Sequence, residues 1–71
     1  MQNNKEKIVY DLIEKFKAER LKQGLSHEKL ATQARIHRTS VGHIEAHQMS
    51  PTLLMCLKIS EALNLNLKDI L

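Results

Sequence analysis

The stretch that decides the fold lies between residues 24 and 45 and reads GLSHEKLATQARIHRTSVGHIE. Ser26 is a favoured helix N-cap, and Glu28 follows it in the positive first turn of the helix that this cap predicts. The apolar residues of this first helix form a narrow stripe at helical spacing: Leu30, Ala31 and Ala34. The stretch therefore begins with one short amphipathic helix.

A second short helix is expected from His37 to Glu45. Val41 and Ile44 are three residues apart and share one side of it, whereas the opposite side is polar. Two short helices joined by three or four residues, the second polar on its outer side, are typical of a helix-turn-helix motif. The motif is expected over about residues 26–45.

Outside this stretch the chain also indicates helices. Apolar residues recur at helical spacing from about Lys5, and Gly24 follows as a stop signal. Ser50 and Pro51 are read as the N-cap and first residue of a fourth helix that ends near Leu63. Asn66 can cap a last turn over residues 68–71, and no strand-like alternation occurs. The prediction is an all-α fold of five helices in a single domain, residues 1–71.

Composition restricts the classes of function. One cysteine among 71 residues forms no internal disulfide, and the longest apolar run, residues 53–57, is far too short to span a membrane. The polar start, residues 1–7, has no apolar leader segment, so a cytoplasmic protein is expected. The net charge of +3 permits a polyanionic partner. The chain has only one Phe, one Tyr and no Trp that could stack on unpaired bases, so double-stranded DNA is the favoured polyanionic partner.

The motif pieces resemble one known family. Residues 24–31, 38–45, 50–53 and 58–63 follow one another as in the Cro and lambda-repressor-like (Xre-type) DNA-binding family, and the resemblance covers about residues 12–70. It implies that the helix from His37 to Glu45 lies in the major groove of DNA, with its outward residues reading base edges. The compact controller proteins of restriction-modification systems, phage-type repressors and antitoxins are similar, and the sequence does not choose among them.

The resemblance assigns roles to individual residues. The base-reading residues are Arg38, Thr39 and His43, and the residues that hold the DNA backbone are His27, His37, Ser40 and Gln48. For each of these the alternative is an exposed polar side chain that contacts only solvent, and for Arg38 a contact with a phosphate is a further alternative. Arg20 and Glu45 are expected to form a partly buried ion pair that orients the two helices.

Two positions depart from the family pattern. Arg35 and His47 occupy turn positions where the family commonly has Gly, and both positions favour a left-handed backbone. A residue with a Cβ atom is strained there. We therefore expect Arg35→Gly to stabilise the domain.

The four histidines, at positions 27, 37, 43 and 47, raise the question of a metal site. Residues 43–47 superficially resemble a zinc protease helix, but Glu45 is two residues after His43 rather than directly after it, and a third ligand is missing. No nucleophile, base and orienting group can be assembled either. We expect no metal, no cofactor and no enzymatic activity, and instead a DNA affinity that rises as pH falls.

Apolar residues surround the predicted fourth helix on every side. Five residues of this helix suit the core of the domain: Leu53, Cys56, Ile59, Ser60 and Leu63. The remaining apolar residues of the C-terminal segment, residues 51–71, are expected to contact a twofold partner: Leu54, Leu57, Leu65, Leu67, Ile70 and Leu71. The alternative is scattered exposed leucine, which is ordinary on protein surfaces.

The sequence thus predicts a homodimeric transcriptional regulator, such as a repressor, that binds a palindromic operator in double-stranded DNA. The alternative is a protein-interaction module of the same fold, for example an antitoxin that binds its toxin through Leu54 and Leu57. Steep dependence of binding on salt would favour DNA over a protein partner.

Overall fold

The computed structural model describes residues 4–71. This part of the chain forms five α-helices and no strand: α1 (Asn4–Lys22), α2 (His27–Ala34), α3 (Arg38–Glu45), α4 (Leu53–Ala62) and α5 (Leu67–Ile70). The predicted all-α fold of five helices is confirmed. The first three residues of the polar start, on which the expectation of a missing leader partly depends, lie outside the described residues.

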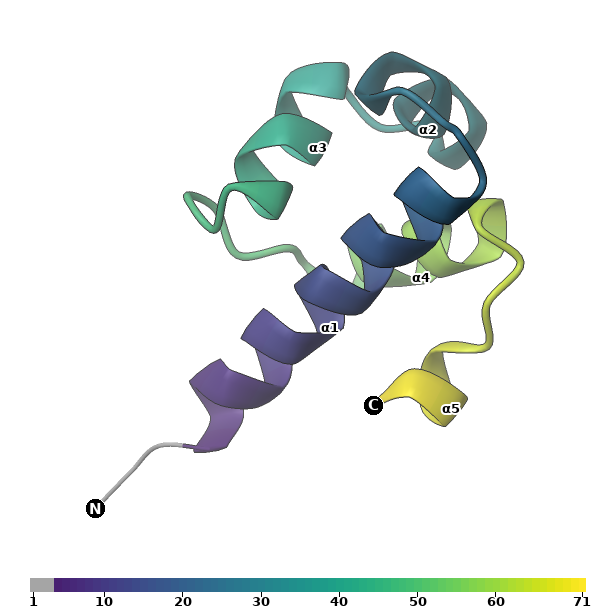
Figure 1. Ribbon diagram of the computed structural model, residues 1–71. Coiled ribbons are helices and arrows are strands. Elements are labelled where there is room, and N and C mark those ends of the chain that lie inside the picture. Colours follow the sequence, from purple (N-terminus) through teal and green to yellow (C-terminus); the bar gives the residue numbers. More distant parts are fainter. Residues whose placement is uncertain (1–3) are drawn as a thin grey trace.

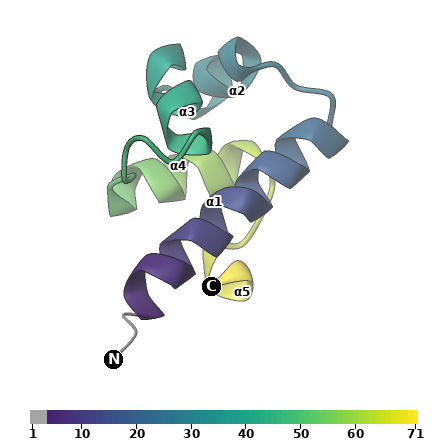
Figure 2. The same cartoon turned by 60° about the vertical axis from the view of Figure 1, so that its left-hand side comes forward.

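The long helix α1 crosses the molecule, and the other helices are grouped along it (Figure 1). The pair α2 and α3 lies toward one end of the molecule, whereas α5 lies beside the middle of α1, in both views (Figure 2). Helix α2 packs against both α3 and α4, and α1 packs against α3. This arrangement leaves the outer sides of α2 and α3 at the surface.

Local signals set most helix boundaries. Gly24 has a φ of +71°, a left-handed conformation that suits glycine and ends the turn after α1. The Ser26 side chain accepts a hydrogen bond from the backbone N–H of Lys29 at 3.0 Å and caps α2. Asn66 caps α5 in the same way by accepting from the N–H of Lys68. Each of these boundaries agrees with its predicted signal.

The sequence-based prediction misplaced the start of α4. Thr52, not Ser50, is the N-cap, because its backbone is extended and its Oγ1 accepts from the N–H of Met55 at 3.1 Å. The helix then begins at Leu53, two residues after Pro51. Pro51 is compatible with the first position of a helix, but threonine is itself a good N-cap, and Thr52 takes the cap role two residues after Ser50.

The core is formed by one side chain cluster from α1 to α4. Its fully buried large members are Phe16, Leu30, Val41, Ile44 and Leu63. Cys56 is also buried, and burial raises the pKa of its thiol, so it packs as a small apolar residue. The expectation that Leu53 belongs to this core was wrong: its side chain is 70% exposed, because α4 begins there and its first turn ends at the surface.

The C-terminal segment is held to the body of the domain. Lys15 Nζ donates to the carbonyl oxygen of Ile70 at 2.7 Å, which connects α5 to α1. Three of the apolar residues expected at a twofold interface pack partly against the core: Leu65, Leu67 and Ile70. Leu54, Leu57 and Leu71 are exposed. None of the helices over residues 4–71 is long and apolar enough to cross a membrane.

Candidate nucleic-acid interface

The turn between α2 and α3 positions the two helices against each other. Arg35 ends α2 with a φ of 58° and a ψ of 45°, the left-handed conformation expected for this position. The next residue, Ile36, donates its N–H to the carbonyl of Ala31 at 3.0 Å, which closes the end of α2. The chain then turns directly into α3, as a helix-turn-helix requires.

The outer side of α3 presents three exposed side chains: Arg38, Thr39 and His43. Arg38 Nη1 lies 3.5 Å from Glu28 Oε2, and both side chains are more than two-thirds exposed. Such an exposed pair contributes little to stability. The guanidinium is therefore left available to a ligand.

His37 caps the start of α3. Its Nδ1 accepts from the backbone N–H of Thr39 at 3.3 Å and also contacts the Thr39 hydroxyl. Ser40 is half-buried in the first turn of α3, and Gln48 is exposed in the loop that follows the helix. These three residues border α3 at its two ends, as their predicted backbone-binding roles require.

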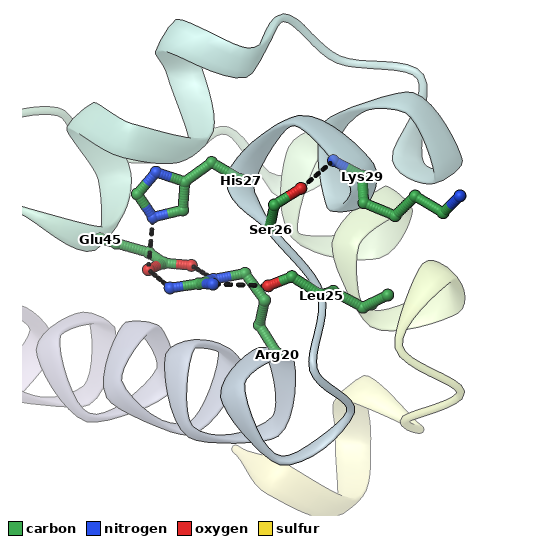
Figure 3. A network of polar contacts seen from close by, with 6 residues as sticks. All are labelled: Arg20, Leu25, Ser26, His27, Lys29 and Glu45. Carbon is green, nitrogen blue, oxygen red and sulfur yellow. Dashed lines mark hydrogen bonds and ion pairs between the residues drawn. The ribbon is translucent and has the colours of Figure 1, made fainter.

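A network of charged side chains lies beneath the first turn of α2 (Figure 3). Arg20 Nε donates to Glu45 Oε2 at 2.7 Å, and Arg20 Nη2 donates to Glu45 Oε1 at 2.8 Å. Arg20 Nη1 donates to the carbonyl oxygen of Leu25 at 2.6 Å. Both charged residues are buried, at 8% and 7% exposure. The two residues that the resemblance pairs are thus in contact, and no buried polar side chain atom over residues 4–71 lacks a partner.

His27 joins this network from α2. Its Nε2 lies 3.1 Å from Glu45 Oε1, while 46% of its side chain remains exposed. Burial alone would raise the pKa of Glu45, but hydrogen bonds from Arg20 and then His27, together with the charge of Arg20, hold that pKa below its ordinary value. Glu45 is an ionised acceptor at neutral pH.

An open hollow lies between the start of α2 and the outer side of α3. It is lined by Arg20, Ser26, His27, Glu28, Arg38, Thr39, Gly42 and His43. Gly42 belongs to this lining, and a Cβ atom added there would meet only His27 Nδ1, at 3.8 Å. The hollow thus joins predicted base-reading residues to the predicted backbone contact at His27.

A helix-turn-helix family model matches residues 16–70, which is most of the chain. The chain belongs to the Cro and lambda-repressor-like (Xre-type) helix-turn-helix family. Comparison with curated proteins and with solved structures found no match.

Membership in this helix-turn-helix family indicates the kind of ligand that the chain binds. The family consists of DNA-binding regulators, so this chain is a DNA-binding helix-turn-helix protein. Within residues 4–71, no group of three or more histidine, cysteine, aspartate or glutamate side chains is arranged to hold a metal ion.

Contacts of two histidines in this helix-turn-helix domain were not predicted from the sequence. His27 bonds to Glu45 across 18 residues, and His47 Nε2 lies 2.6 Å from Glu14 Oε2 while its ring stacks on Tyr10. None of these contacts follows a local spacing rule, because each joins two different helices or a helix and a loop. Only the packing angle of α3 against α1 and α2 brings these side chains together.

Proposed function

We propose that this chain is a sequence-specific regulator of transcription that binds double-stranded DNA as a homodimer, with α3 in the major groove. The observation that carries this proposal is the outer side of α3. Arg38, Thr39 and His43 are exposed there and contribute no side chain to the core, in a helix pair whose family binds DNA. Side chains that the fold does not need are free to contact bases.

Each of these three residues suits a particular base contact. The planar fork of Arg38 matches the O6 and N7 acceptors of guanine, and the Thr39 methyl group suits the methyl group of thymine. His43 donates or accepts according to its tautomer. These residues supply the specificity of binding.

The backbone contacts are assigned to residues at the borders of the helix pair. His37 uses Nδ1 to cap α3, so its Nε2 remains for a phosphate. Ser40, Gln48 and His27 complete the set, the last at the positive end of α2. These residues position the protein without reading sequence.

The homodimer is proposed to form through the C-terminal helices. Leu54, Leu57 and Leu71 are exposed, and a groove between α4 and α5 is lined in part by Leu57, Leu65 and Leu67. Burying these leucines against a second copy removes apolar area from water. Ile70 supports α5 from the core side. A twofold dimer places two α3 helices on half-sites about 34 Å apart.

In this account the dimer acts in the cytoplasm, as a repressor where its operator overlaps a promoter. A palindromic operator follows from the twofold symmetry. The dimer acts only by occupying its operator, with no cofactor and no catalysis.

A second candidate function is supported by the leucines of α4. Leu53, Leu54 and Leu57 are exposed on neighbouring turns, as an antitoxin surface for a protein partner would be. Dependence on salt separates the two functions, because log K for DNA falls by about 0.9 with each unit of log salt for every phosphate neutralised.

The test is the affinity of the purified chain for a mixed-sequence duplex at several salt concentrations between about 50 and 200 mM. The proposal predicts binding with a steep slope that corresponds to several phosphates. A folded protein that binds no duplex at the lowest salt concentration would leave the protein-interaction function as the better account.

A further inference from the structure

His27 is held between a buried carboxylate and the hollow proposed to receive DNA. Figure 3 shows its ring above the Glu45 carboxylate, with one ring nitrogen toward Glu45 and the other on the far side of the ring. Arg20 donates two further hydrogen bonds to that carboxylate. The carboxylate and the His27 ring are therefore fixed relative to each other.

This contact determines which ring nitrogen carries hydrogen. An ionised carboxylate only accepts hydrogen bonds, and the lowered pKa of Glu45 keeps it ionised. His27 Nε2 must therefore be the donor in the 3.1 Å contact with Glu45 Oε1. In a neutral ring with hydrogen on Nε2, Nδ1 is a lone-pair acceptor.

In the neutral ring, Nδ1 cannot form a hydrogen bond with a phosphate. Nδ1 lies beside Gly42, in the hollow between α2 and α3. A phosphate diester oxygen also only accepts hydrogen bonds, so it cannot bond to a neutral Nδ1. Once the ring takes up a proton, Nδ1 donates to the phosphate while Nε2 continues to donate to Glu45.

The charges around His27 favour the protonated ring when DNA is present. The groups that face it are Arg20 from α1, Glu45, Arg38 and His43 from α3, and Glu28 on its own helix. Arg20 is neutralised by Glu45, and Arg38 lies beside Glu28. A bound phosphate adds a negative charge on the side of the ring that lacks a hydrogen-bonded carboxylate.

We infer that each subunit takes up one proton from solvent at His27 Nδ1 when a DNA phosphate occupies this hollow, so that DNA binding is linked to pH through His27. This inference rests on the proposed function. By linkage, a proton gained on binding makes affinity rise as pH falls.

The other histidines do not have this arrangement. His37 Nδ1 accepts from the N–H of Thr39, so protonation there would break the cap of α3. His47 is stacked on Tyr10 and bonded to the partly exposed Glu14, and it does not line the hollow. His43 lines the hollow as an exposed side chain without a carboxylate partner among the described residues. His43 is also a proposed base-reading residue, so His47, which has no proposed DNA contact, is the control.

The experiment measures the dissociation constant for a mixed-sequence duplex between about pH 6 and 8 at constant low salt. For wild type we expect affinity to rise by up to about tenfold per subunit for each pH unit lowered. His27→Gln should bind with a much flatter profile, because an amide donates at every pH in this range, and His47→Gln should keep the wild-type slope. A wild-type slope in His27→Gln, or a flat wild-type profile, would overturn the inference.

A direct measurement on the wild-type protein accompanies the variants. Nitrogen NMR of the His27 ring at about pH 7.5 should show hydrogen on Nε2 alone in the free protein and on both nitrogens in the DNA complex. A ring that stays neutral in the saturated complex would contradict the inference. Failure of the folded protein to bind duplex at any pH would instead remove the proposed function, and the inference with it.

Discussion

Arg20 in α1 and Glu45 at the end of α3 are joined by two parallel hydrogen bonds of 2.7 and 2.8 Å in a buried position. The planar guanidinium fork matches both oxygens of the carboxylate, so the contact fixes an angle as well as a distance. A third bond, from Arg20 to the carbonyl of Leu25, holds the guanidinium in place. The orientation of α3 therefore depends on α1 as well as on apolar packing.

Glu45→Gln is expected to destabilise the domain strongly. It leaves the buried Arg20 charge without its counter-ion, and the expected loss is about 3 kcal/mol in the free energy of unfolding. Chemical denaturation at neutral pH measures it. Glu61→Gln is the control, because Glu61 is exposed and its carboxylate has no ion pair among residues 4–71. Equal stability of the two variants would contradict this account.

The ion pair between Arg20 and Glu45 should make the stability of the domain depend on pH in acid. Because the folded protein lowers the pKa of Glu45, the pair's stabilisation is complete above the ordinary glutamate pKa of about 4.3 and is lost as pH falls through the lower folded value. The free energy of unfolding should therefore fall as pH decreases below the ordinary glutamate pKa. In Glu45→Gln it should fall less steeply. Parallel profiles for wild type and variant from pH 7 to 3 would refute the assignment.

Arg35→Gly is expected to stabilise the domain by up to about 1 kcal/mol, because glycine adopts a positive φ without strain. The Arg35 side chain makes no hydrogen bond or ion pair with the rest of the described chain. His47 has nearly the same φ, but His47→Gly also removes the contacts with Glu14 and Tyr10. Thermal unfolding should rank Arg35→Gly above wild type and His47→Gly below Arg35→Gly. A lower melting temperature for Arg35→Gly would show that strain is not the controlling factor.

Sequence reasoning predicted those features that local chemistry determines. The stop at Gly24 and the cap at Ser26 follow from conformational preferences of single residues. The left-handed turns at Arg35 and His47 oppose the preferences of Arg and His, and they were predicted from the family resemblance. The start of α4 was misplaced because Ser50, Pro51 and Thr52 each carry a plausible start signal. Thr52 takes the cap, since its Oγ1 accepts from the backbone N–H of Met55.

Contacts between distant residues were predicted only where the family resemblance supplied them. The pairing of Arg20 with Glu45 came from that resemblance, whereas the bond from His27 to the same carboxylate did not. Leu53 was misplaced for a related reason. Its spacing from Cys56 fits the core side of a helix, but the helix end lies at the surface.

Arg38 provides the sharpest test of base reading. If its fork contacts a guanine, Arg38→Lys should cost about 1 to 3 kcal/mol on the preferred site while retaining most binding to mixed-sequence duplex. Arg38→Ala should weaken both. The measurement is a pair of dissociation constants for each variant. Equal losses on the two duplexes in Arg38→Lys would assign Arg38 to a phosphate instead.

Leu54→Ser should shift the chain from dimer to monomer, since it removes an exposed leucine from the proposed twofold interface. Leu21→Ser is a matched control, because Leu21 on α1 has the same 59% exposure and lies outside that interface. Sedimentation velocity at micromolar concentration distinguishes the two outcomes. A monomeric wild type would exclude the proposed dimer. An unchanged dimer in Leu54→Ser would place the interface elsewhere.

The central claim is that α3 reads sequence in double-stranded DNA as half of a symmetric pair. Selection from a random-sequence duplex library at about 150 mM salt tests this claim most directly. We expect enrichment of a palindrome whose half-sites are one helical turn apart, about 34 Å from centre to centre. A folded protein that enriches no sequence would contradict the claim.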